Sequence, residues 1–318
     1  MNTNFIWIGA RKTTHWSSPE QDLFGIIKLI ENKEKNEENY EINLFCLDEY
    51  VYEFYYFFYF NKKNTFIYHD GFSRLKINVS ILIIGVNVFI NEIIKFHPEY
   101  TKIRLIFNFL REKSFLSEFH FITYRVILKD FLSLIASYFI GGYTIDTNVY
   151  PENNNNISLK SHKKLKFIKL KNGANSAFYY VRTSYTQSTN VSIATMVLAN
   201  ARKGRMLYAS EVDPSIMKDY VSFADLFDCW LLFSPKHDEL TKFALEYYLN
   251  EFSVTVTENN LYGNLIISSL ANAIYQLGEE EMLDDNNYFI STQEANSALA
   301  FVPELNLVKK YQNTHKIK

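Results

Sequence analysis

The chain has 318 residues, 47% of them hydrophobic and 17% aromatic, which is enough for a sizeable core in one large domain or two modest ones. Its 33 basic and 35 acidic residues nearly cancel to a formal charge of −2, so composition predicts no nucleic-acid partner and no broad basic face for anionic lipid. Cys46 and Cys229 lie far apart, which argues against a disulfide-stapled secreted fold and a zinc site.

The first fifty residues predict a strand, a helix and a second strand. Residues 4–8 are apolar and end at Gly9, as a buried strand does. Ser18 and Pro19 provide an N-cap and a first helical residue, so a helix is expected from there to about Lys33. Residues 42–47 are the next strand. This order favours an α/β sheet with parallel pairing.

The middle of the chain is expected to be mostly helical between about 50 and 120. The aromatic run 50–60 is interpreted as core packing, with a partner-binding surface as the alternative. Residues 124–140 are apolar at helical spacing and stop at Gly141 and Gly142. Residues 144–149 then predict a strand, which ends before Pro151.

The second half gives weaker signals. Lysines at 160–171 alternate with apolar residues and predict a solvated strand face, with a phosphate or acceptor contact as the alternative. The expected strands are 178–183 and 191–198, the expected helical or mixed segments are 223–233 and 242–252, and a helix is expected at 265–277. Residues 284–301 are polar and irregular. Nothing resembles a long linker, so we expect a single domain over residues 1–318.

Two oxygen-bearing side chains, Asp146 and Asn148, lie near the end of the strand that follows the glycine pair. Residues two apart on a strand point the same way, and ligands bind where the strands of open α/β sheets end. Carboxylate and amide oxygens suit a hard divalent cation and the phosphates that it bridges. The pattern therefore predicts a site for a metal and a phosphorylated ligand.

The segment Gly141-Gly142-Tyr143-Thr144-Ile145-Asp146-Thr147-Asn148 resembles the "GG-x-Y-x-D-x-D" region of GT-A glycosyltransferases. It is most similar to the glucosyltransferase domain of large clostridial cytotoxins. Those toxins carry an Asp twelve residues before the second glycine, and Asp130 has that spacing from Gly142. The resemblance implies that Asp130 binds sugar hydroxyls, and that Asp146 holds the ribose and the metal.

Two further blocks resemble the toxins in the expected order. Trp7, in the first strand, stands where a toxin tryptophan stacks on uracil. Residues 291–299 are similar to a toxin loop with the pattern Glu-x-x-Ser-x-Trp, so Glu294 and Ser297 would complete a metal shell with Asp146 and Asn148. Leu299 occupies the donor-binding position of the tryptophan.

One weaker match and three departures qualify the resemblance. Asn190 is a candidate for the toxins' polar pair near the donor sugar, with an ordinary turn asparagine as the alternative. Asn148 replaces a charged ligand by a neutral one, which should weaken a metal site. Ser133 stands in place of an arginine that steadies the donor, and Leu299 lacks an indole donor.

The resemblance implies a GT-A fold, in which a mixed, mostly parallel sheet is flanked by helices, with a helical insertion at about 50–120 and an active-site loop at about 284–302. It implies a retaining, Mn²⁺- or Mg²⁺-dependent transfer of a hexose, Glc or GlcNAc, from a UDP-sugar to a hydroxyl of a protein or glycan. Three functions stay open: a bacterial effector that modifies a host protein, a cell-envelope polysaccharide transferase, and a degenerate domain that binds nucleotide-sugars without catalysis.

Residues 1–9 lack the basic head and apolar run of a secretion signal, and the apolar stretches 79–90 and 131–145 are too short to cross a bilayer. We therefore expect a chain without transmembrane segments. It would be cytoplasmic, or delivered into a host cell by a route that needs no signal peptide.

Overall fold

The computed structural model describes a large part of the chain. The described residues are 1–9, 23–36, 39–62, 66–69, 74–77, 81–116, 121–147, 149–151, 159, 166–168, 228–252, 265–266, 269–270, 273, 299–302 and 307–310. The expected strands at 178–183 and 191–198, and the expected helix start at Ser18, lie outside this part of the chain.

An eight-stranded mixed sheet runs through the molecule in the order β3-β4-β5-β2-β1-β6-β9-β8. Its strands are β1 (Asn2–Trp7), β2 (Glu41–Cys46), β3 (Phe66–His69), β4 (Arg74–Ile77), β5 (Ile81–Gly85), β6 (Gly142–Ile145), β8 (Lys166–Ile168) and β9 (Asp228–Ser234). The central strands β5, β2, β1 and β6 are parallel, whereas the outer strands on both sides pair antiparallel.

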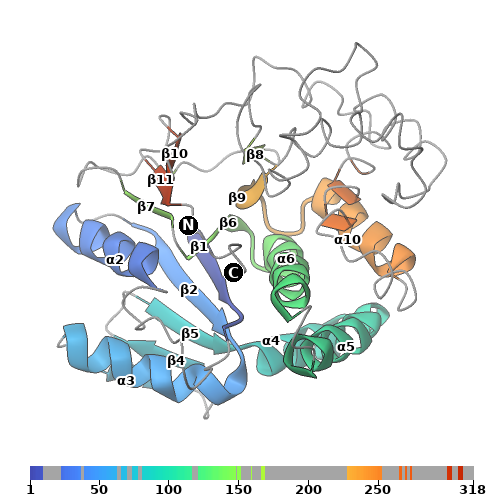
Figure 1. Ribbon diagram of the computed structural model, residues 1–318, viewed down its shortest axis with the longest axis horizontal. Helices are drawn as coiled ribbons and strands as arrows, with labels where there is room; N and C mark the ends of the chain where they lie inside the picture. Colours follow the sequence, from blue (N-terminus) through green and yellow to red (C-terminus); the bar gives the residue numbers. More distant parts are fainter. Residues whose placement is uncertain are drawn as a thin grey trace, which may run out of the picture.

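Helices cover both faces of this sheet (Figure 1). The helices described over their full length are α2 (Phe24–Asn36), α3 (Val51–Lys62), α4 (Val86–Phe96), α5 (Lys102–Leu116), α6 (Phe121–Phe139) and α10 (Glu239–Glu251), with short 3₁₀ turns η1 (Asp48–Tyr50) and η2 (Pro98–Tyr100). The expected α/β class, a mixed, mostly parallel sheet flanked by helices, is confirmed, and the parallel pairs lie at the centre of the sheet.

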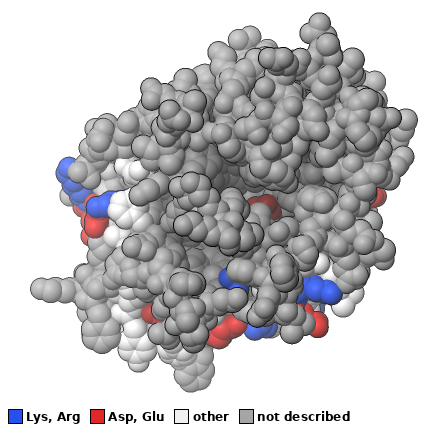
Figure 2. Space-filling view, in the orientation of Figure 1, with Lys and Arg blue, Asp and Glu red and all other residues white. Residues whose placement is uncertain are grey.

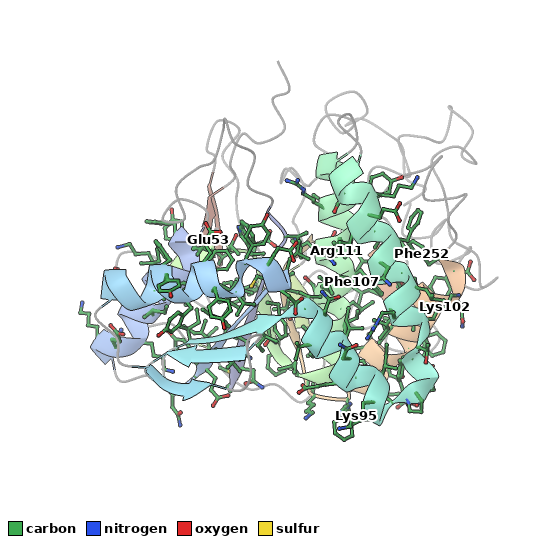
Figure 3. All side chains as sticks on the ribbon, turned by 90° about the horizontal axis from the view of Figure 1, so that it is seen from below. Glu53, Lys95, Lys102, Phe107, Arg111 and Phe252 are labelled. Atoms are coloured by element: carbon green, nitrogen blue, oxygen red, sulfur yellow. The ribbon has the colours of Figure 1, made fainter. Side chains whose placement is uncertain are left out.

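The two faces of the sheet carry separate cores because strand side chains alternate between faces. On β1, Phe5 and Trp7 join the core beneath α2 and α3, whereas Ile6 joins the core shared by α4, α5, α6 and α10. Figure 3 shows the molecule from below, with the buried Phe107 of α5 in the core shared by α4, α5, α6 and α10. Lys95 and Lys102 lie at its exposed margin.

A smaller three-stranded sheet joins distant parts of the chain. β11 (Leu307–Lys310) pairs antiparallel with β10 (Leu299–Val302) on one side and with β7 (Val149–Pro151) on the other. Helix α2 packs against β7, where the Gly25 amide donates to the Thr147 carbonyl at 3.0 Å. A Cβ at Gly25 would lie 2.1 Å from the Val149 carbonyl oxygen, so this approach requires glycine.

Several sequence-based boundaries differ from the structure. The segment 50–120 contains helices α3, α4 and α5, but it also supplies β3, β4 and β5, so it is part of the sheet as well as a helical block. The expected strand 144–149 is divided between β6 and β7. The segment 223–233, expected to be helical or mixed, contains strand β9 in its described part.

Other expectations agree with the structure. The aromatic run at 50–60 forms much of α3, where Val51, Phe54 and Phe58 are buried in the core. Helix α10 covers most of the expected segment 242–252, and the described residues between 265 and 273 are helical. Among the described helices, none is long and apolar enough to cross a membrane.

Candidate functional site

The connection from α6 to β6 depends on its two glycines. Gly141 and Gly142 have φ of 73° and 87°, which side chains with a Cβ rarely adopt. The Gly141 amide donates to the Ala136 carbonyl, a bond that closes the end of the helix. A Cβ on Gly142 would lie 2.2 Å from the Asn2 carbonyl oxygen, so β6 can approach β1 closely only with glycine here.

Buried polar side chains fix this connection against the neighbouring strands. Asn4 of β1 donates to the Gly141 carbonyl at 2.9 Å, and Asn43 of β2 donates to the Asn4 side-chain oxygen at the same distance. The hydroxyls of Ser137 on α6 and Thr144 on β6 are 3.0 Å apart. These bonds fix the glycine connection to β1 and β2 and join α6 to β6; α6 carries Asp130, and Asp146 directly follows β6.

Asp130 and Asp146 both contact one ammonium group. Lys129 Nζ lies 2.7 Å from Asp146 Oδ1 and 3.2 Å from Asp130 Oδ1. Asp146 follows the last residue of β6, at the edge of the sheet where the parallel strands end, and Lys129 and Asp130 come from α6. The structure therefore brings together two of the residues selected from the sequence and adds a lysine between them.

The three charged groups are largely sheltered from solvent. Their side chains are 24% exposed for Lys129, 11% for Asp130 and 18% for Asp146. Burial lowers the pKa of Lys129, but the carboxylates of Asp130 and Asp146 outweigh it, so the pKa lies above its ordinary value and the amine stays charged. The group carries two negative charges and one positive charge.

A pair of stacked aromatic rings lies near Asp130. The Tyr248 ring, from α10, stacks on Phe131 with ring centroids 5.0 Å apart. Burial, together with the charge of Asp130, raises the pKa of the Tyr248 hydroxyl above its ordinary value. The tyrosine therefore remains a neutral neighbour of the carboxylate.

Trp7 lies at the same edge of the sheet, at the end of β1. Its side chain is buried, with 5% exposed, and makes T-shaped contacts with Tyr50 and Phe54 at ring-centroid distances of 5.1 Å and 4.8 Å. Uracil stacking on Trp7 stays a prediction, because a base would have to reach a ring that already packs in the core beneath α3.

The remaining candidate residues are only partly placed. Asn148, Asn190, Glu294 and Ser297 lie outside the described residues. Leu299 is the first residue of β10, one edge strand of the small sheet. The other edge strand is β7, which begins three residues after Asp146. Strand β10, which begins at Leu299, therefore shares a sheet with the segment that follows Asp146.

The donor set for a divalent cation is incomplete in the part of the chain described. Asp130 and Asp146 offer carboxylate oxygens of the kind that Mn²⁺ or Mg²⁺ prefers, so the residue types fit. The described residues contain no group of three or more His, Cys, Asp or Glu side chains placed to hold a metal. Three of the four expected ligands, Asn148, Glu294 and Ser297, fall outside them.

Sequence reasoning missed Lys129, although a signal was present. Between residues 126 and 140, Lys129 and Asp130 are the only charged residues in an otherwise apolar or hydroxyl-bearing helix. Charges in such a helix need partners, since burying an unpaired charge is costly. Ser133, one turn later, directs its hydroxyl to the Lys129 carbonyl at 2.9 Å.

The sequence matches no protein-family model and no curated protein. Among solved structures, the fold is similar to that of the PaToxG glycosyltransferase, with a TM-score of 0.43 and 13% identity over 89% of this chain and 71% of that chain.

Proposed function

We propose that the protein is a metal-dependent glycosyltransferase that moves a hexose, Glc or GlcNAc, from a UDP-sugar to an acceptor hydroxyl. One observation carries the proposal: Asp130 and Asp146, selected by their resemblance to donor-site residues, meet at Lys129 beside the ends of the parallel strands. Ligands bind at this edge in open α/β sheets.

In this proposal each residue has a defined role. Asp130 accepts hydrogen bonds from sugar hydroxyls, and Asp146 orients the ribose and holds the divalent cation. Asn148, Glu294 and Ser297 complete the ligand set, while Trp7 binds the base, and Asn190 and Leu299 line the donor sugar. When bound, the cation neutralises charge on the departing diphosphate. The burial of Asp130 favours this role, because hydrogen bonds strengthen where water is excluded.

The acceptor divides the proposal into two cases. A bacterial effector would glycosylate a protein of a host cell after delivery by a route without a signal peptide. A cell-envelope transferase would act on a polysaccharide from the cytoplasm. Figure 2 shows Lys, Arg, Asp and Glu side chains interspersed at the margins of the described surface, and acidic surface in the hollow near the middle. The near balance of 33 basic and 35 acidic residues over the whole chain favours an acceptor other than nucleic acid.

A second candidate is a domain that binds a nucleotide-sugar without transferring it. Two contacts favour it: the ion pair of Lys129 with the Asp146 oxygen that would bind metal, and the hydrogen bond that turns Ser133 toward its own helix. Such a domain would bind a UDP-sugar and release no UDP.

The experiment is UDP release from a panel of UDP-sugars, with Mn²⁺ or with a chelator. We expect release from one sugar in the presence of Mn²⁺. Asp146→Ala should reduce release by about 100-fold or more, because it removes a group that stabilises charge in the site. The matched control is Asp238→Asn, since Asp238 caps α10 and asparagine is also a good N-cap.

The outcomes separate the candidates. Metal-dependent release that Asp146→Ala abolishes, with release unchanged in Asp238→Asn, supports the transferase. Binding of a UDP-sugar without release supports the non-catalytic domain. Wild-type release rates in a folded Asp146→Ala protein would contradict the assignment of Asp146.

A further inference from the structure

Lys129 occupies the carboxylate that a divalent cation would use in the proposed site. Its ammonium donates to Asp146 Oδ1 at 2.7 Å and lies 3.2 Å from Asp130 Oδ1. The carboxylate of Asp146 would also bind the cation in the proposed function. The lysine and the metal therefore have a common ligand.

Both cations cannot hold Asp146 Oδ1 in the observed geometry. A divalent cation lies about 2.0–2.6 Å from an oxygen ligand. Placed there, it would be close to the ammonium and would be repelled by it, in surroundings largely sheltered from solvent. For the metal to bind at Oδ1, Nζ must leave that oxygen.

The lysine has the means to leave. Its four-carbon stem is flexible, and a quarter of the side chain is already exposed. Asp130 provides a second carboxylate that can keep the ammonium nearby after it leaves Asp146. In the metal-free protein, however, the ammonium offsets the repulsion between two sheltered carboxylates.

We infer that Lys129 is a positioning residue that holds Asp130 and Asp146 together in the metal-free protein, and that its ammonium competes with the divalent cation for Asp146. The inference rests on the proposed function, which places the metal at Asp146. Lys129 would then control the affinity for the metal, and through it the fraction of the protein that is loaded with metal and able to bind the UDP-sugar.

The test is titration of the metal-free protein with Mn²⁺ by calorimetry. Lys129→Met removes the competing charge at similar side-chain length, and we expect the Mn²⁺ dissociation constant to fall by about tenfold or more. A neighbouring charge changes proton binding to a carboxylate by a comparable factor. Lys129→Arg keeps the charge and should retain the wild-type affinity.

The matched control is Lys242→Met, because Lys242 lies on α10 and pairs with Glu246 within its own helix at 3.8 Å. Its Mn²⁺ affinity should equal that of the wild type. Combining Lys129→Met with Asp146→Asn should remove the gain, since the ligand under competition is then lost. If Lys129→Met does not fold, Lys129→Gln removes the same charge, keeps donor groups, and should show the same gain.

The inference would be overturned if Lys129→Met or Lys129→Gln bound Mn²⁺ no more tightly than the wild type, or if no variant bound Mn²⁺. It would also be overturned if the gain in Mn²⁺ affinity persisted when Lys129→Met is combined with Asp146→Asn. Its failure is distinguishable from failure of the proposed function. Metal-dependent UDP release by the wild type without a gain in Lys129→Met removes the inference alone. A gain without UDP release from any sugar removes the transferase and leaves the inference standing.

Discussion

At the scale of single residues, the most informative side chain outside the charged group is Asn4. It receives a hydrogen bond from Asn43 and donates one to the Gly141 carbonyl, and it is fully buried. Asn4→Leu should lower the free energy of unfolding by roughly 2–4 kcal/mol, because it leaves two buried polar groups without partners. Denaturant unfolding measures this loss.

The comparison variant is Asn2→Ala. Asn2 makes a longer bond of 3.4 Å to the Ile140 carbonyl and is only half-buried, so its loss should cost less than about 1 kcal/mol. Equal effects of the two substitutions would show that the buried chain of amides does not hold the strands to the glycine turn.

The sequence predicted some site residues and missed others for a physical reason. Asp130 and Asp146 could be selected because they lie at fixed positions relative to a glycine pair. The contact of Asp146 with Lys129 depends on how α6 lies on β6, which no local pattern specifies. The same is true of Trp7, whose burial between Tyr50 and Phe54 depends on the packing of α3.

At the scale of elements, the glycine turn between α6 and β6 controls the position of Asp146. Gly142→Ala should destabilise the protein by roughly 2–4 kcal/mol, because φ of 87° strains alanine and its Cβ would press on the Asn2 carbonyl. We also expect weaker UDP-sugar binding, since β6 must shift relative to β1. Thermal unfolding and calorimetric binding test both effects; unchanged values for both would contradict the role of this turn.

Helices and strands whose ends are marked in the sequence by residues such as glycine could be predicted, whereas those without such residues at their ends could not. Helix α6 was located because its apolar run stops at Gly141 and Gly142. Strand β5 passes into α4 within one apolar stretch, and the boundary is set by Asp48, which accepts hydrogen bonds from the Asn87 amide and side chain at 2.9 Å and 2.8 Å. Strand β9 was ambiguous because a short apolar run suits either a strand or a buried helix.

At the scale of the whole molecule, the initial strand–helix–strand pattern predicted the α/β class but not the order of the strands. Strand order depends on pairings between distant segments, such as β6 with β1 and with β9. The two cores follow from strand alternation once this order exists. The single-domain organisation stays a prediction.

Buried groups that lose a proton at high pH give the molecule a common response to alkali. Burial is the main cause that raises the pKa of Cys46, Tyr100 and Tyr248. For Lys129 burial acts downward, but the two carboxylates raise the pKa overall. All four groups therefore hold their protons more tightly in the folded protein than in the unfolded chain.

Stability must consequently fall as pH rises above about 9, because the unfolded chain then releases protons that the folded protein retains. The contribution is complete below the unfolded pKa values and is lost as pH climbs toward the folded ones. Thermal unfolding from pH 7 to 11 should show a decreasing midpoint, steepest above about pH 10. Tyr248→Phe keeps the ring that stacks on Phe131 but removes one titrating group. In this variant the unfolding midpoint should fall less steeply with pH above pH 10 than in the wild type. A midpoint that stays constant to pH 11, or an equal slope in the variant, would show that these groups are not held protonated by the fold.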